Sequence, residues 1–129
     1  MYKIFKFLLL IFFCFFSLLQ QTIYAQEKIK IGLLVPLTGD DKKIGEQIIK
    51  SIRIALNDIN TDKIEIYLKD TKSDPKTTLR SAIELRELGI KIVIGPIFYK
   101  NLEYLDEVKE VTFLSFTNKT INLPSNIIS

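Results

Sequence analysis

The chain has 129 residues, a formal net charge of +3, no histidine and a single cysteine, Cys14. Without histidine, and with its cysteine inside an apolar N-terminal run, it lacks most of the nucleophile and base pairings of enzyme catalysis. Removing residues 1–25 takes away two lysines and no acidic residue, so the net charge falls to +1. No basic patch remains to indicate nucleic-acid binding.

The N-terminus predicts export. Two lysines precede an apolar run from Phe7 to Leu19, which is shorter than the roughly 20 residues of a spanning helix. Ala25 is a small residue suited to the cleavage position, so we predict a signal peptide over residues 1–25 and a periplasmic chain over residues 26–129. An uncleaved anchor is the alternative, because Ile23 is larger than the ideal residue two positions before the cut.

Strands and helices alternate through the remaining residues, which suffice for one domain with its own core. The predicted elements are strand 29–35, helix 44–57, strand 64–68, helix 75–88, strand 90–94, helix 100–109 and strand 112–116, and a fifth strand could start at Ile127. Crossovers between parallel strands then predict an α/β fold, a doubly wound parallel sheet with helices on both faces.

Each predicted helix has an apolar stripe at helical spacing. In the first helix the stripe comprises Ile44, Ile48, Ile49, Ile52, Ala55, Leu56 and Ile59. The second helix has Leu79, Ala82 and Ile83, with Leu88 as a further candidate, and the third has Leu102, Leu105 and Val108. Each stripe is wide enough to cover part of a sheet.

Residues 70–96 form a strand-helix-strand module with clear boundaries. Asp74 can cap the helix, and Pro75 suits its first position, where no N–H partner is needed. Gly89 can take the left-handed conformation that ends a helix. The apolar, mostly β-branched run 90–94 predicts a strand buried under helices on both faces, and the Gly-Pro pair after it ends the strand.

Short motifs follow the strands in a fixed order. They are Gly-Leu-Leu-Val-Pro-Leu-Thr-Gly at 32–39, Asp-Pro at 74–75, Ile-Gly-Pro at 94–96 and Ser-Phe-Thr-Asn at 115–118. Together they resemble the leucine-binding-protein branch of the type I periplasmic binding proteins, over residues 29–129. The resemblance implies the N-terminal lobe of a two-lobed fold.

Members of that family are much longer than this chain, so we predict a truncated fragment whose second lobe is absent. A complete single-lobe protein is the alternative. Without a second lobe, less of a ligand's surface is enclosed, and we expect weak ligand binding.

Ligands of open parallel sheets bind at the carboxyl ends of the strands, near the point where the strand order reverses. This rule nominates the loops 36–43, 95–99 and 115–119. In the family that the motifs resemble, these loops hold the carboxylate end of an amino acid or similar small ligand. The resemblance therefore implies that the ligand-binding residues of this sequence are Thr38, Gly95, Ser115, Thr117 and Asn118. Each loop could instead have a purely structural role. Residues 38–39 could form a turn, residues 95–96 could end a strand, and the polar side chains of residues 115–118 could bond to their own loop backbone.

One segment departs from the family pattern. Amino-acid-binding members usually carry small hydroxyl residues shortly after the third strand, where this chain has Ile97, Phe98, Tyr99 and Lys100. Phe98 or Tyr99 could stack on a ligand or belong to the core. Gly-Pro-Ile-Phe at 95–98 also resembles the penicillin-binding-protein activator branch, which shares the fold and regulates cell-wall synthesis through protein contact.

The sequence therefore predicts a non-enzymatic, extracytoplasmic solute-binding component of an ABC transporter, which binds an amino acid or small carboxylate and contacts a permease. The alternative is a regulator that contacts a cell-wall synthase. No cofactor is implied, and neither a nucleotide-binding glycine motif nor an Asp-x-Asp-x-Asp-Gly calcium loop is present. We assign no metal ligand, although a site built from oxygen ligands alone stays open.

Overall fold

The computed structural model describes residues 1–6, 27–117 and 123–129. The predicted signal-peptide run with Cys14 and Ala25, and the candidate Asn118, lie outside these ranges. The elements are β1 (Ile29–Val35), α2 (Lys42–Ile59), β2 (Ile64–Asp70), α3 (Pro75–Glu87), β3 (Ile92–Ile94), the 3-10 turns η1 (Tyr99–Leu102) and η2 (Leu105–Glu107), β4 (Thr112–Leu114) and β5 (Ile127–Ile128).

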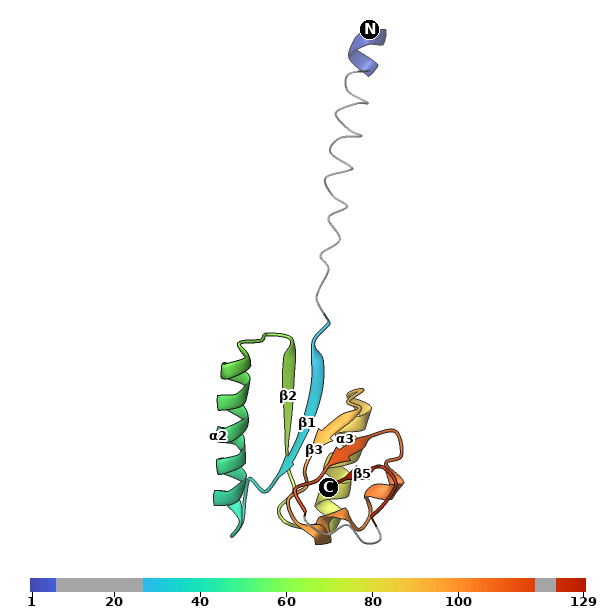
Figure 1. The fold of residues 1–129 in the computed structure, drawn as a ribbon. Helices are drawn as coiled ribbons and strands as arrows, with labels where there is room; N and C mark the ends of the chain where they lie inside the picture. Colours follow the sequence, from blue (N-terminus) through green and yellow to red (C-terminus); the bar gives the residue numbers. More distant parts are fainter. Residues whose placement is uncertain (7–26, 118–122) are drawn as a thin grey trace.

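The strands form one parallel sheet in the order β2-β1-β3-β4-β5 (Figure 1). Helix α2 lies on one face of the sheet and α3 on the other. The predicted α/β class and doubly wound parallel sheet are confirmed. No helix within the described ranges is long and apolar enough to cross a membrane.

The predicted start of the helix in the strand-helix-strand module, and the glycine that follows its end, are confirmed. The Thr77 N–H donates to Asp74 Oδ2 at 2.7 Å, and Pro75 is the first residue of α3. Gly89 follows the helix with a φ of 77°. These features depend on residues within one turn of each other, which is why the sequence pattern alone predicts them.

The hydrophobic core lies on the α3 side of the sheet. Gly32 of β1 has no side chain there, so Leu85 of α3 and Val93 of β3 pack directly against its backbone. Phe113 of β4 and Leu34 of β1 are fully buried in the same cluster. Leu85 was missing from the predicted apolar face of α3, although it follows Ala82 by three residues and thus shares its side of the helix.

The helix predicted over residues 100–109 is wrong, because this segment forms η1 and η2 instead. Its stripe still faces the core, since Leu102, Leu105 and Val108 are buried. A spacing of three residues fits the 3.0-residue period of a 3-10 turn as well as an α-helix. The Asn126 side chain also donates to the carbonyls of Leu105 and Val108 at 2.9 and 3.1 Å, so these carbonyls have a partner outside any helix.

The strand predicted over residues 90–94 differs in length and in burial. β3 begins only at Ile92, whose side chain is 42% exposed. The expectation of helices covering this strand on both faces is therefore wrong, because α2 packs over β1 and β2. The prediction failed here because burial of a strand depends on how many helices share a face, and local sequence does not encode that number.

Candidate functional site

The strand order reverses between β1 and β3. From β1 the chain passes through α2 to β2 on one side, and from β2 it returns through α3 to β3 on the other side. The loops that follow β1 and β3 therefore leave the same edge of the sheet beside each other and diverge. Residues 36–41 and 95–98 flank this point, as the sequence pattern predicts.

Asp70, at the end of β2, holds the loop after β1. Its carboxylate accepts hydrogen bonds from the Leu37 N–H at 2.8 Å, the Thr38 hydroxyl at 2.7 Å and the Lys72 N–H at 2.9 Å. Burial by itself would raise the pKa of Asp70, but these hydrogen bonds outweigh it and hold the pKa below its usual value. Asp70 was not among the predicted site residues, and its only sequence signal is an acid at a strand end.

The loops after β3 and β4 are bound to each other. The Gly95 N–H donates to the Leu114 carbonyl at 2.8 Å, and the Ser115 hydroxyl donates to the Pro96 carbonyl at 3.2 Å. The Ser115 oxygen also accepts from the Thr117 N–H at 3.2 Å. Gly95 has a φ of 102°, and a Cβ there would lie 2.3 Å from the Leu34 carbonyl oxygen. Only glycine fits this position.

The candidate residues thus fall into two groups on either side of the reversal point. Thr38 lies with Asp70 on the β2 side, and Gly95, Ser115 and Thr117 lie together on the other side. Among the residues that the structure describes, no hydrogen bond joins 36–39 to 95–98. A ligand at the reversal point would lie between two loops that are each fixed by their own neighbours.

These hydrogen bonds limit what each side chain can offer. The Thr38 hydroxyl proton is directed at Asp70, so its oxygen remains as an acceptor. Ser115 already donates one hydrogen bond and accepts another, both within its own loops. The geometry therefore gives Ser115 a structural role and leaves Thr38 suited to a donor group of a ligand, such as an ammonium.

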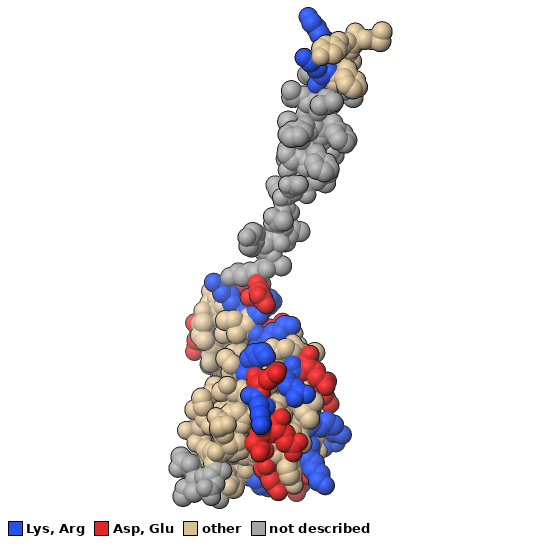
Figure 2. Space-filling model, turned by 90° about the vertical axis from the view of Figure 1, so that its right-hand side faces the viewer, with Lys and Arg blue, Asp and Glu red and all other residues tan. Residues whose placement is uncertain are grey.

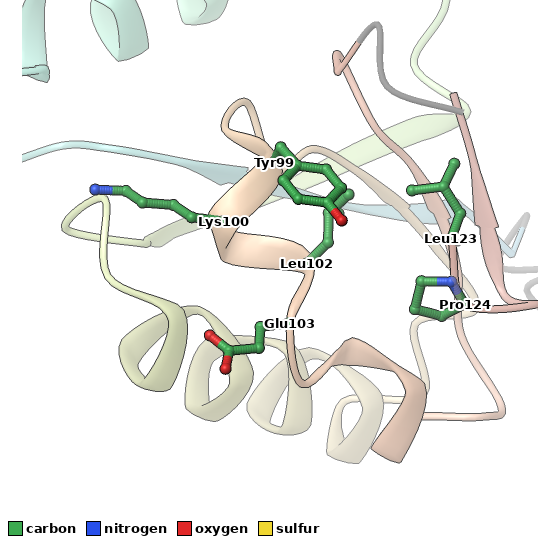
Figure 3. A pocket seen from close by; sticks show the side chains of 6 residues that line it. All are labelled: Tyr99, Lys100, Leu102, Glu103, Leu123 and Pro124. Atoms are coloured by element: carbon green, nitrogen blue, oxygen red, sulfur yellow. The ribbon is translucent and has the colours of Figure 1, made fainter. Parts of the chain in front are cut away.

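A cavity of about 450 Å³ adjoins these loops. Figure 3 shows Tyr99 and Leu102 of η1 facing Leu123 and Pro124 across it, with Lys100 and Glu103 extending away from that wall. Tyr99 is 40% exposed and Phe98 is half-buried, so neither belongs to the buried core. The volume is within the range of about 300–1,000 Å³ that is usual for small-molecule pockets.

Comparisons with known proteins agree with this architecture. Residues 28–123 match the family model for periplasmic binding proteins. The Leu/Ile/Val-binding protein BraC3 of Rhizobium johnstonii is 32% identical over 79 residues, which make up 57% of this chain and 22% of that protein. The chain thus spans about a fifth of the length of the curated relatives it matches.

Solved structures show the same fold. The leucine binding protein LivK of Thermotoga maritima has a TM-score of 0.61 at 21% identity, covering 67% of this chain and 27% of that one. The C-domain of LpoA from Haemophilus influenzae, a regulator of PBP1A, has a TM-score of 0.62 at 24% identity, covering 76% and 31%. At these identities the likeness concerns the fold alone.

Proposed function

We propose, because this chain belongs to the periplasmic binding protein family, that the sheet edge between β1 and β3 is one wall of a solute-binding cleft. The observation that carries the proposal is the reversal of strand order between two separately fixed loops. The names of the Leu/Ile/Val-binding relatives favour an amino acid or similar small polar ligand. The protein would act outside the cytoplasm as a non-enzymatic substrate-binding component of an ABC transporter.

Each candidate residue has a distinct role in this proposal. The Thr38 oxygen accepts a hydrogen bond from the ligand's ammonium group, because its own proton is directed at Asp70. Gly95 positions its loop by packing against the Leu34 carbonyl, and Thr117 and Asn118 supply the polar contacts to the ligand. Ser115 supports the ligand indirectly by fixing the loop that carries Thr117.

A thermal shift titration tests this function, and it uses the exported product of the whole reading frame that contains these 129 residues. Leucine, isoleucine, valine and small carboxylates are added separately, because a ligand that binds only the folded state raises the melting temperature with dose. We expect a rise with an amino acid, and a smaller rise in Thr38→Val. Thr112→Val, which alters an exposed threonine at the opposite end of β4, is the matched control and keeps the full ligand-induced rise.

The alternative function is a regulator of cell-wall synthesis that acts by protein contact. It rests on the Gly-Pro-Ile-Phe and Ser-Phe-Thr-Asn segments and on the shared fold with the LpoA domain. If no solute changes the melting temperature while the chain co-purifies with a penicillin-binding cell-wall synthase, the transport proposal fails and this one stands.

A further inference from the structure

The two carboxylate oxygens of Asp70 have different partners in the loops around them. The Oδ1 atom accepts hydrogen bonds from the Leu37 and Lys72 N–H groups at 2.8 and 2.9 Å. The Oδ2 atom accepts from the Thr38 hydroxyl at 2.7 Å. An ionised carboxylate can only accept hydrogen bonds, so the Thr38 proton points at Asp70 and is not available to a ligand. Thr38 therefore presents only an oxygen lone pair to the cleft.

The carboxylate also gives this part of the cleft a negative charge. On the face of the lobe in Figure 2, acidic and basic side chains lie interspersed. Asp70 is half-buried beside the exposed Thr38, and no ion pair within the described ranges includes it. A cationic donor on a ligand is favoured at such a place, because a charge-assisted hydrogen bond is roughly twice as strong as a neutral one.

We propose that Asp70 selects the ligand class of the cleft by fixing Thr38 as an acceptor, an inference that rests on the proposed solute-binding function. The chain then prefers 2-amino acids to 2-hydroxy and 2-oxo acids with the same carbon skeleton. The ammonium group of an amino acid donates to the Thr38 oxygen and carries the favourable charge. The hydroxyl of a 2-hydroxy acid donates without a charge. The carbonyl of a 2-oxo acid only accepts, so it would face the Thr38 oxygen unpaired.

An asparagine at position 70 should reverse this polarity. Because two N–H groups bind the Oδ1 atom, the amide oxygen of Asp70→Asn keeps that position and the amide nitrogen takes the place of Oδ2. The nitrogen then donates to the Thr38 oxygen, and the Thr38 proton is released toward the ligand. The negative charge is lost at the same time. A 2-oxo acid thus gains a donor, and an amino acid loses its acceptor.

Isothermal titration calorimetry at pH 7 tests the proposal with the exported product of the whole reading frame that contains these 129 residues. The probes are leucine, its 2-hydroxy analogue and its 2-oxo analogue, each titrated into the unmodified protein and into Asp70→Asn. We expect the unmodified protein to bind leucine at least about tenfold more tightly than the 2-oxo acid. Asp70→Asn should lower this ratio of affinities at least about tenfold. A ratio measured within one variant is unaffected by a general loss of folded protein.

Two controls separate selection of the ligand from support of the loop. In a Thr38→Val background the ratio should no longer respond to Asp70→Asn, because the hydroxyl that transmits the effect is gone. Asp58→Asn changes an exposed acidic residue in the last turn of α2, away from these loops, and should leave the ratio unchanged. Circular dichroism should show that all the variants are folded.

The affinities also distinguish a failure of this proposal from a failure of solute binding. If Asp70→Asn weakens all three ligands by the same factor, or changes the ratio equally in Thr38→Val, Asp70 only supports the loop, and the proposal fails while solute binding stands. Binding of the 2-oxo acid as tightly as leucine to the unmodified protein would overturn it too. A protein that binds none of the three probes contradicts the proposal, and the melting titration then shows whether the solute-binding function fails with it.

Discussion

At the scale of single residues, Gly95 is the position where backbone geometry constrains the site most. Its φ of 102° is unfavourable for a residue with a side chain, and a Cβ there would lie 2.3 Å from the Leu34 carbonyl oxygen. Both effects therefore exclude other residues. Gly39 also has a positive φ, 84°, but nothing lies within 4 Å of a Cβ there. Alanine substitutions at the two glycines therefore separate the cost of the backbone conformation from the cost of the steric contact.

We predict that Gly95→Ala lowers the free energy of unfolding by about 3 kcal/mol or more, because it combines strain with a clash against backbone. Gly39→Ala should cost about 1 kcal/mol, the usual penalty of a left-handed conformation. Urea unfolding of both variants measures the two costs. Equal losses would show that the contact with Leu34 relaxes freely.

Protonation of Asp70 at low pH should weaken the hydrogen bonds that hold the loop after β1. Its pKa is lowered in the folded state, so its contribution to stability is present above the unfolded-state pKa and disappears as the pH falls through the folded-state pKa. We predict that Asp70→Asn melts at a lower temperature than the unmodified chain at pH 7, and that the gap closes as the solution is acidified.

Melting curves recorded between about pH 7 and pH 2 test this prediction. Asp74 and Glu84 also have lowered pKa values, so part of the acid sensitivity remains in the variant. Asp58→Asn is the matched control, because the Asp58 side chain makes no hydrogen bond or ion pair within the described part of the chain. A gap for Asp70→Asn that stays constant with pH would contradict the assignment.

At the scale of elements, irregular structure carries part of the core. Leu105 lies in η2 and is fully buried, whereas Leu88 caps the longer helix α3 and is 46% exposed. We predict that Leu105→Ala costs about 2–5 kcal/mol of stability, the range for a buried leucine. Leu88→Ala should cost less than about 1 kcal/mol. Thermal or urea unfolding that ranked them in the opposite order would place the core elsewhere.

The elements that sequence predicted well are those fixed by neighbours along the chain. The cap of α3 involves Asp74 and Thr77, which are only three residues apart. The 3-10 turns were missed because a three-residue apolar spacing suits both helix types. The boundaries of α2, at Lys42 and Ile59, extend two residues beyond the predicted helix at each end.

The loops of the candidate site were predicted by their position at strand ends, but not their internal bonds. Thr38 binds Asp70 across 32 residues of sequence, and Ser115 binds Pro96 across 19. Such partners depend on which strands become neighbours, and this follows from the assembled sheet. The sequence therefore predicts where polar groups gather, whereas the sheet decides which of them stay available to a ligand.

At the scale of the whole molecule, the two faces of the sheet are unequally packed. The core cluster lies on the α3 side, and α3 buries Thr78, Ser81, Ala82 and Leu85. On the other face, Gly45 is the one residue of α2 that is buried, and the cavity near Arg53 separates part of the helix from β1 and β2. Local stability should follow this difference, because opening α2 exposes less apolar surface.

We predict that the backbone amides in the middle of α2 exchange hydrogen at least about tenfold faster than those of α3, because a smaller burial gives a smaller free energy of local opening. Hydrogen exchange followed by mass spectrometry of peptides from each helix measures the ratio, and both helices lie in one molecule under one condition. The longer α2 would be the slower helix if intrinsic helical length set the protection. Slower exchange in α2 would therefore mean that its stability does not come from packing on the sheet.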